Sequence, residues 1–258
     1  MVVSQLPQLK ISAPVKAILG AILIMGELGA FSPTSHPALA KEPVVSVIRV
    51  KQNHEFFGGM VALIGKTEFR LINTGAWKFV LVSQAPKWDV TVYNPHDKTM
   101  LKLSLDQFDQ SGLVSEMFTG RKSRMQGNSR SFVNLVKNGV PIVRYQDRFD
   151  AIEFISPAMI NPAIESIIYA AYKMPTNKGF PLSLAGHGSG RDFVTGLDQT
   201  GKKEVYLSTI TIEKVSVPKE QFAEPQNYKV AASMREVILT KQKREGDAEA
   251  LQDLMRDK

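Results

Sequence analysis

The stretch VLVSQAPKWDVTVYN, residues 80–94, decides the fold class because it has the pattern of a strand, a tight turn and a second strand. In its second half, Val90 and Val92 flank Thr91, so apolar and polar residues alternate. This period of two is typical of a β-strand whose two faces meet different surroundings. Pro86 lies where the chain must reverse. The stretch therefore predicts a β-hairpin.

Short alternating segments continue on both sides of this hairpin, and turn residues separate them. Strands repeating every 8–12 residues or so are typical of an antiparallel meander. Later in the chain, Asn138 and Gly139 stand between two apolar runs, which is a strong hairpin signal. The segments that we predict as strands are residues 60–64, 67–72, 77–83, 88–94, 99–105, 131–137, 140–145, 151–155 and 204–218.

One helix is predicted over residues 161–174. Asn161 has the residue type of an N-cap, Pro162 suits the first helical position, and Pro175 ends the pattern. Apolar residues recur at the spacing of a single helical stripe, which must cover another apolar surface. We therefore predict a mainly antiparallel β fold with few helices, in which a curved sheet is covered by a helix. The stripe consists of Ile164, Ile167, Ile168, Ala171 and Tyr172.

The first forty residues have the features of a secretory signal. Lys10 and Lys16 precede an apolar run at residues 17–25, which is too short to span a bilayer. The sequence Ala-Leu-Ala at residues 38–40 offers a cleavage site. We expect an exported, periplasmic protein that is cleaved near Ala40. Cleavage after Ala30 and a retained interfacial anchor are the alternatives.

The expected organisation after the signal is a β domain over residues 41–235 and a charged, solvated helical tail over residues 236–258. The chain has 258 residues, enough for one large domain or two small ones. It contains no Cys, which excludes disulfides, a Cys nucleophile and thiolate metal sites. A formal net charge of +7 favours anionic surfaces, although many ordinary soluble proteins share it.

Residues able to do chemistry are few. His54, His96 and His187 are far apart and lie in or beside predicted turns, so we expect surface or turn histidines. The segment GHGSGRD at residues 186–192 lacks the spacing of a nucleophile elbow, a dinucleotide loop or a phosphate loop, and a flexible hairpin loop is expected. We therefore predict no catalytic residue, no metal ligand and no cofactor.

Two groups of charged residues have simple interpretations. The carboxylates Asp147, Asp150 and Glu153 are expected to cap turns and to form cross-strand charge pairs rather than an acid–base pair. A basic segment without interleaved aromatic residues could contact a partner or the anionic headgroups of a membrane surface, or could be a solvated loop. Nucleic acid is not expected. The basic residues are Arg121, Lys122, Arg124 and Arg130.

The apolar faces of the strands and the helix are the remaining candidate site. Their simplest role is a packed core, but a bent sheet under a helix can also leave an apolar hollow. Each buried methylene contributes about 0.8 kcal/mol, so an acyl chain could bind there without any catalytic group. A one-residue error in register would reverse the choice of strand face. The candidate lining residues are Phe79, Leu81, Val90, Val92, Leu101, Leu103, Ile164, Ile167 and Ile168.

Two longer segments resemble a known family. They are FVLVSQAPKWDVTVYNPHDKTM (residues 79–100) and STITIEKVSVPKEQFAEPQNYKV (residues 208–230), in which Phe222, Pro225 and Tyr228 match a closing turn. Residues 44–230 resemble the periplasmic lipoprotein-carrier (LolA/LolB-like) superfamily and its uncharacterised relatives. The resemblance implies a half-open antiparallel barrel closed by helices, with an interior that shelters acyl chains.

These observations together predict an exported, non-enzymatic protein that carries or senses a lipid or an acylated protein. We expect a monomer. A module for protein–protein interaction in the cell envelope, with a sheet filled by its own side chains, is the first alternative. A hydrolase is the second.

Overall fold

The computed structural model describes residues 43–113, 132–146, 151–187 and 203–239. The predicted signal segment, the basic residues Arg121, Lys122, Arg124 and Arg130, and the carboxylates Asp147 and Asp150 lie outside these ranges. None of the helices in the described part of the chain is long and apolar enough to cross a membrane.

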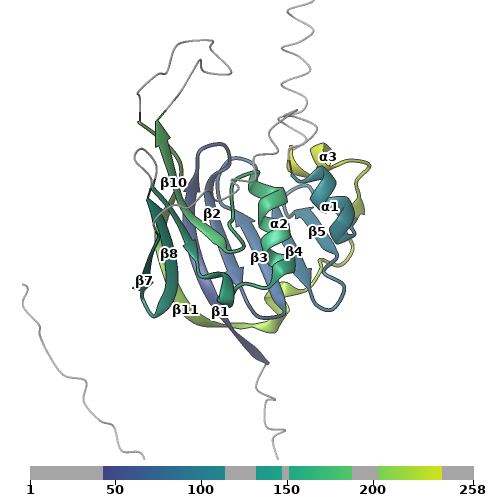
Figure 1. Ribbon diagram of the computed structural model, residues 1–258. Helices are drawn as coiled ribbons and strands as arrows, with labels where there is room; N and C mark the ends of the chain where they lie inside the picture. Colours follow the sequence, from purple (N-terminus) through teal and green to yellow (C-terminus); the bar gives the residue numbers. More distant parts are fainter. Residues whose placement is uncertain (1–42, 114–131, 147–150, 188–202, 240–258) are drawn as a thin grey trace, which may run out of the picture. The chain divides into compact units, whose positions relative to one another are not determined.

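A single sheet of twelve strands contains most of the described residues (Figure 1), and it is not closed into a barrel. The order is β12-β6-β5-β4-β3-β2-β1-β11-β10-β9-β8-β7, and every pairing is antiparallel except that of β12 with β6. The mainly antiparallel β class predicted from the sequence is therefore confirmed. The strands are β1 (Val44–His54), β2 (Gly58–Ile64), β3 (Glu68–Asn73), β4 (Val80–Gln84), β5 (Val90–Asn94), β6 (Thr99–Leu103), β7 (Phe132–Lys137), β8 (Val140–Gln146), β9 (Ala151–Ile155), β10 (Phe180–His187), β11 (Lys203–Pro218) and β12 (Lys229–Val230).

Local turn chemistry explains the hairpins. The predicted hairpin at residues 80–94 consists of β4 and β5, in which Leu81 faces Val92 across the pair. Between β7 and β8, Asn138 and Gly139 both have positive φ (49° and 73°). Asn and Gly tolerate this conformation, and the turn that it forms matches the twist of the flanking strands.

The longest pairing joins segments from opposite ends of the described chain. β1, which was not predicted as a strand, pairs with β11 along its whole length. Ile210 of β11 has no partner opposite it in this pairing, next to Gln52, and Leu182 of β10 has none in the pairing with β9, so each is a β-bulge. Such bulges bend a strand and increase its twist. We therefore expect these bulges to bend the sheet locally at β10 and β11.

Helix α2 (Pro162–Tyr172) forms where it was predicted. The side chain of Asn161 accepts a hydrogen bond from the amide of Ala163, and Lys173 ends the helix in a left-handed conformation. Helix α1 (Leu105–Ser111) begins with a capping box in which Ser104 and Gln107 bond reciprocally. The two helices contact each other and lie over one face of the sheet, in front of β3, β4 and β5 (Figure 1). A short 3-10 helix, η1 (Pro157–Met159), precedes α2.

The chain after β11 follows a path that the sequence pattern did not indicate. It forms the 3-10 helix η2 (Lys219–Phe222), the parallel strand β12 and helix α3 (Met234–Ile238). In α3, Met234, Val237 and Ile238 are buried in the main apolar cluster. The body of the protein therefore extends past the expected limit at residue 235, and the start of the segment expected to be a solvated tail is part of the core.

Candidate functional site

The nine predicted lining residues meet on one face of the sheet, here called the inner face. Phe79, Leu81, Val90 and Val92 belong to the same buried cluster as the three isoleucines of α2. Leu101 and Leu103 are partly buried and pack against that cluster. The register of the strands explains why these residues share a face. Leu81, Val92 and Leu101 lie directly opposite one another on β4, β5 and β6, and residues paired in this way point to the same side of a sheet.

The space between α2 and the inner face is filled by these side chains. Ile164, Ile167, Ile168, Leu81 and Val92 each have a relative exposed area of 0%. A side chain without accessible surface borders no void that would admit even a water molecule. The expected hollow is therefore occupied by the protein's own side chains at these positions, and an acyl chain could enter only if the helix moved.

A buried polar cluster lies where the end of α2 meets the sheet. The amide nitrogen of Gln52 donates to the carbonyl of Pro181 (2.7 Å), and the hydroxyl of Tyr172 donates to the amide oxygen of Gln52 (3.2 Å). The hydroxyl of Thr209 donates to the carbonyl of Leu182, the residue skipped in the β9–β10 pairing (2.5 Å). These side chains thus supply hydrogen-bond partners for the backbone carbonyls at the bulges. Buried backbone groups need such partners. Burial raises the pKa of Tyr172, so this hydroxyl remains a hydrogen-bond donor.

His54 is buried beside this cluster, in contrast to the surface position expected from the sequence. Its Nδ1 accepts hydrogen bonds from the amides of Phe56 (3.1 Å) and Phe57 (3.4 Å). Its ring packs edge-on against the ring of Tyr172, with 4.8 Å between centroids. Nε2 is buried without a partner within hydrogen-bond distance. Burial lowers the pKa of His54 to about 4, although the backbone of Tyr172 acts in the opposite direction. The imidazole is therefore neutral near pH 7 and joins the β1–β2 turn to the end of α2.

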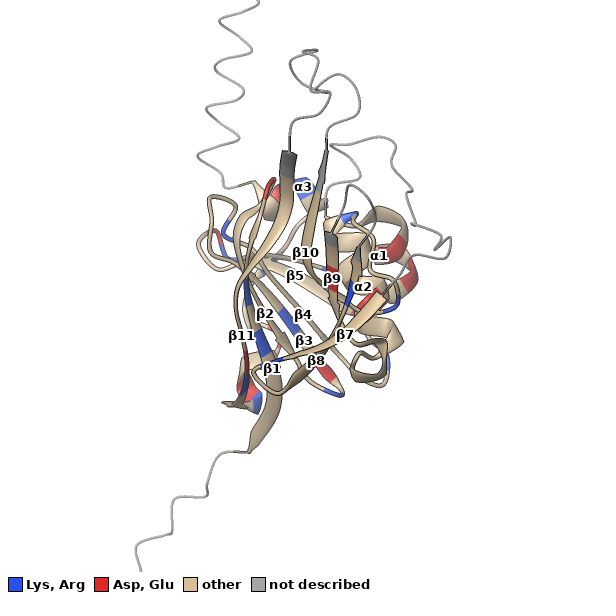
Figure 2. Ribbon diagram, turned by 60° about the vertical axis from the view of Figure 1, so that its left-hand side comes forward, with Lys and Arg blue, Asp and Glu red and all other residues tan. Residues whose placement is uncertain are grey.

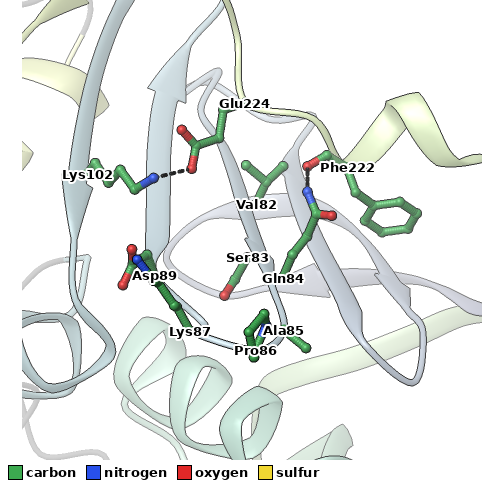
Figure 3. Close-up of a pocket in the computed structure, with 10 residues that line it drawn as sticks. All are labelled: Val82, Ser83, Gln84, Ala85, Pro86, Lys87, Asp89, Lys102, Phe222 and Glu224. Carbon is green, nitrogen blue, oxygen red and sulfur yellow. Dashed lines mark hydrogen bonds and ion pairs between the residues drawn. The ribbon is translucent and has the colours of Figure 1, made fainter.

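A surface hollow lies beside the β4–β5 turn and has a volume of about 230 Å³ (Figure 3). It is lined by residues 82–87, Asp89, Lys102, Phe222 and Glu224. Lys102 and Glu224 form an ion pair at its rim (2.7 Å), and the hydrogen bond that Lys102 donates to Glu224 raises the pKa of Lys102. The cation and the anion partner each other, so a charged ligand would have to break this pair.

The segment with the Phe–Pro–Tyr pattern, residues 219–230, crosses the outer face of the sheet; we call it the strap. Phe222 is fully buried against Val47, Leu63 and Val217. The ring of Tyr228 packs edge-on against Tyr93, with 5.7 Å between centroids. The strap therefore covers the face of the sheet opposite α2. It ends with β12, and the chain then continues into α3. Its aromatic residues are anchors in packing and do not face the inner cluster.

One group of charged residues in the described part of the chain joins β7, β8 and β9. Glu153 binds Arg144 on β8 (2.5 Å) and Lys137 on β7 (2.6 Å), as predicted for cross-strand charge pairs. Burial opposes the charge of Glu153, but the two cations hold its pKa below the usual value. Within the described ranges, no group of three His, Asp or Glu residues could hold a metal ion.

No protein-family model matches the sequence, and no curated protein matches it.

Proposed function

We propose that the protein is an exported, non-enzymatic binding protein of the cell envelope, which takes the acyl chain of a lipid or of an acylated protein between α2 and the inner face. One observation carries the proposal: apolar residues from β1–β5, from β8–β11 and from the three helices converge in a single cluster, and α2 covers it on one face of the sheet.

The energies involved are compatible with displacement of the helix. Exposing Ile164, Ile167 and Ile168, three of the six buried residues of α2, would by itself cost roughly 5–9 kcal/mol, at 1.5–3 kcal/mol for each side chain. An acyl chain of about sixteen carbons contributes on the order of 10 kcal/mol when it is buried. The chain would thus replace the contacts that the helix loses. Binding of shorter chains would leave the helix closed.

The absence of Cys allows a direct test. In the Ile168→Cys variant the only thiol lies beneath α2, where a water-soluble maleimide reagent cannot reach it in the closed state. With saturating long-chain fatty acid, the proposal expects the labelling rate to change and native mass spectrometry to detect a bound lipid. Ile210→Cys is the matched control, since Ile210 is 61% exposed on β11 and should react at the same rate with and without lipid. No lipid in the mass spectrum and no change in labelling would contradict the proposal.

The second candidate is an interaction module whose core serves only stability. The complete burial of the three α2 isoleucines favours the interaction module, because an apolar ligand could enter only by disrupting this close packing. This candidate expects a lipid-free protein in native mass spectrometry and an Ile168→Cys thiol that stays unreactive throughout. The basic segment at residues 121–130 is its proposed contact with an acidic partner or an anionic membrane surface. Charge reversal at Arg121, Lys122 and Arg124 would abolish that contact.

A further inference from the structure

Strand β7 forms one border of the sheet and is unusually apolar for an exposed strand. Within the described residues it pairs with β8 alone (Figure 2). Its residues Phe132, Val133 and Val136 are 60%, 54% and 70% exposed. Neighbouring residues of a strand point to opposite faces, so apolar side chains are exposed on both sides of β7. The free edge also presents unpaired backbone donors and acceptors.

Nothing in the described chain blocks this edge. Proteins usually protect an edge strand with a proline, a bulge or an unpaired charge. β7 contains no Pro, and its register with β8 is continuous. Its single charged residue, Lys137, is at the end of the strand and is bound to Glu153. As far as the described residues are concerned, the edge is therefore open to a further strand.

The order of residues in β7 indicates which strand fits. The apolar residues are placed symmetrically about Asn134, with Phe132 and Val136 on one side of the strand and Val133 and Leu135 on the other. We propose that β7 pairs antiparallel with β7 of a second copy of this chain, centred on Asn134. Phe132 then faces Val136 of the second copy, Val133 faces its Leu135, and the two Asn134 side chains meet on the axis.

Charge and continuity with the core support a second copy as the occupant. The pairing ends at Val136, so Lys137 lies outside it and no two cations face each other. Leu135 already packs against the main apolar cluster, and a neighbouring Val133 would extend that surface. The exposed parts of Phe132, Val133 and Val136 together amount to roughly 300 Å² per copy, if a whole aromatic side chain has an area of 150–250 Å². Two copies would therefore bury roughly 600 Å² in total, which is below the roughly 1,200 Å² of a stable interface, so the dimer is weak and forms at high protein concentration.

Cross-linking tests the register, again because the chain has no other Cys. In the Asn134→Cys variant the two thiols would face each other across an antiparallel pair, with Cα atoms about 4.5–5.5 Å apart. This distance suits a disulfide. In Val133→Cys, the control on the adjacent exposed residue, the two Cα atoms would be roughly 8 Å apart, which is too far for a disulfide. Under mild oxidation we expect Asn134→Cys to form covalent dimers at least roughly tenfold faster than Val133→Cys.

Sedimentation velocity over a concentration series tests the interface without a thiol. The wild-type protein should shift towards the dimer as its concentration rises, and Val136→Lys should remain monomeric. Ile210→Lys, an equally exposed apolar position on β11, should dimerise like the wild type. The proposal is overturned by a wild-type monomer at every concentration, by equal cross-linking of the two Cys variants, or by a monomer whose β7 binds lipid vesicles instead.

Discussion

Acidification should destabilise this protein through His54. The neutral ring accepts two backbone hydrogen bonds at Nδ1 and packs against Tyr172. A protonated ring would present an N–H to the amides of Phe56 and Phe57, so the folded protein resists protonation. The unfolded chain accepts the proton at the ordinary histidine pKa.

The size of the effect follows from the difference between the two pKa values. The pKa of His54 falls from 6.5 to about 4 in the folded protein. Each unit corresponds to 1.36 kcal/mol, so the free energy of unfolding should change by about 3 kcal/mol. The folded pKa is the lower one, so this stability is complete above pH 6.5 and is lost as the pH falls towards 4. Below that pH both states are protonated and no further loss comes from His54.

Urea unfolding at a series of pH values between about 7 and 4 measures this loss. The fluorescence of Trp77 and Trp88 reports the transition, since both rings contact the main cluster. In His54→Asn the amide oxygen can replace Nδ1 as the acceptor, but it cannot be protonated in this range. The variant should be less stable than the wild type at pH 7, and its free energy of unfolding should fall by about 3 kcal/mol less on acidification.

A matched control replaces a histidine that is not buried. His96→Asn changes an exposed side chain in the turn between β5 and β6, and it should retain the full acid dependence of the wild type. The reasoning is refuted if His54→Asn and the wild type lose stability in parallel between pH 6.5 and 4. It is equally refuted if His96→Asn removes the dependence.

Three further predictions follow from the same contacts. Gln52→Leu should lower the free energy of unfolding by about 2–4 kcal/mol in urea titrations, because it leaves the carbonyl of Pro181 and the hydroxyl of Tyr172 buried without partners. Phe222→Ala should cost about 3–5 kcal/mol and raise the rate of limited proteolysis after β11, since it removes the anchor of the strap. Glu153→Gln should be less stable than the wild type near neutral pH, and titration in urea should show the difference shrinking as the pH falls through the lowered pKa of this carboxylate.

Much of the local structure could be predicted from the sequence. The alternation of apolar and polar residues around Val90 and the turn residues Asn138-Gly139 predict two hairpins that the structure contains, β4–β5 and β7–β8. Asn161 and Pro162 begin the observed helix, and the choice of strand face placed the lining residues together on the inner side. In each case the signal and the structure lie within about ten residues of each other, so short-range sterics and hydrogen bonds suffice.

Long-range contacts decided the rest. β1 is paired with β11, more than 150 residues later, and no local pattern marks that partner. His54 was expected at the surface because it precedes a turn, but the helix that buries it comes from another part of the chain. The sparse apolar residues of α3 suggested a solvated helix, although they complete the main cluster.

The sequence by itself therefore determined the class of the fold, the hairpins, the main helix and the apolar face that the strands share. The tertiary structure alone decided that this face is filled by isoleucines of α2, that a histidine is neutral and buried, and that β7 has no second partner strand among the described residues. The physical reason is that burial, packing density and strand order depend on which distant segments meet, and a local pattern of residues specifies the face of each segment but not its neighbour.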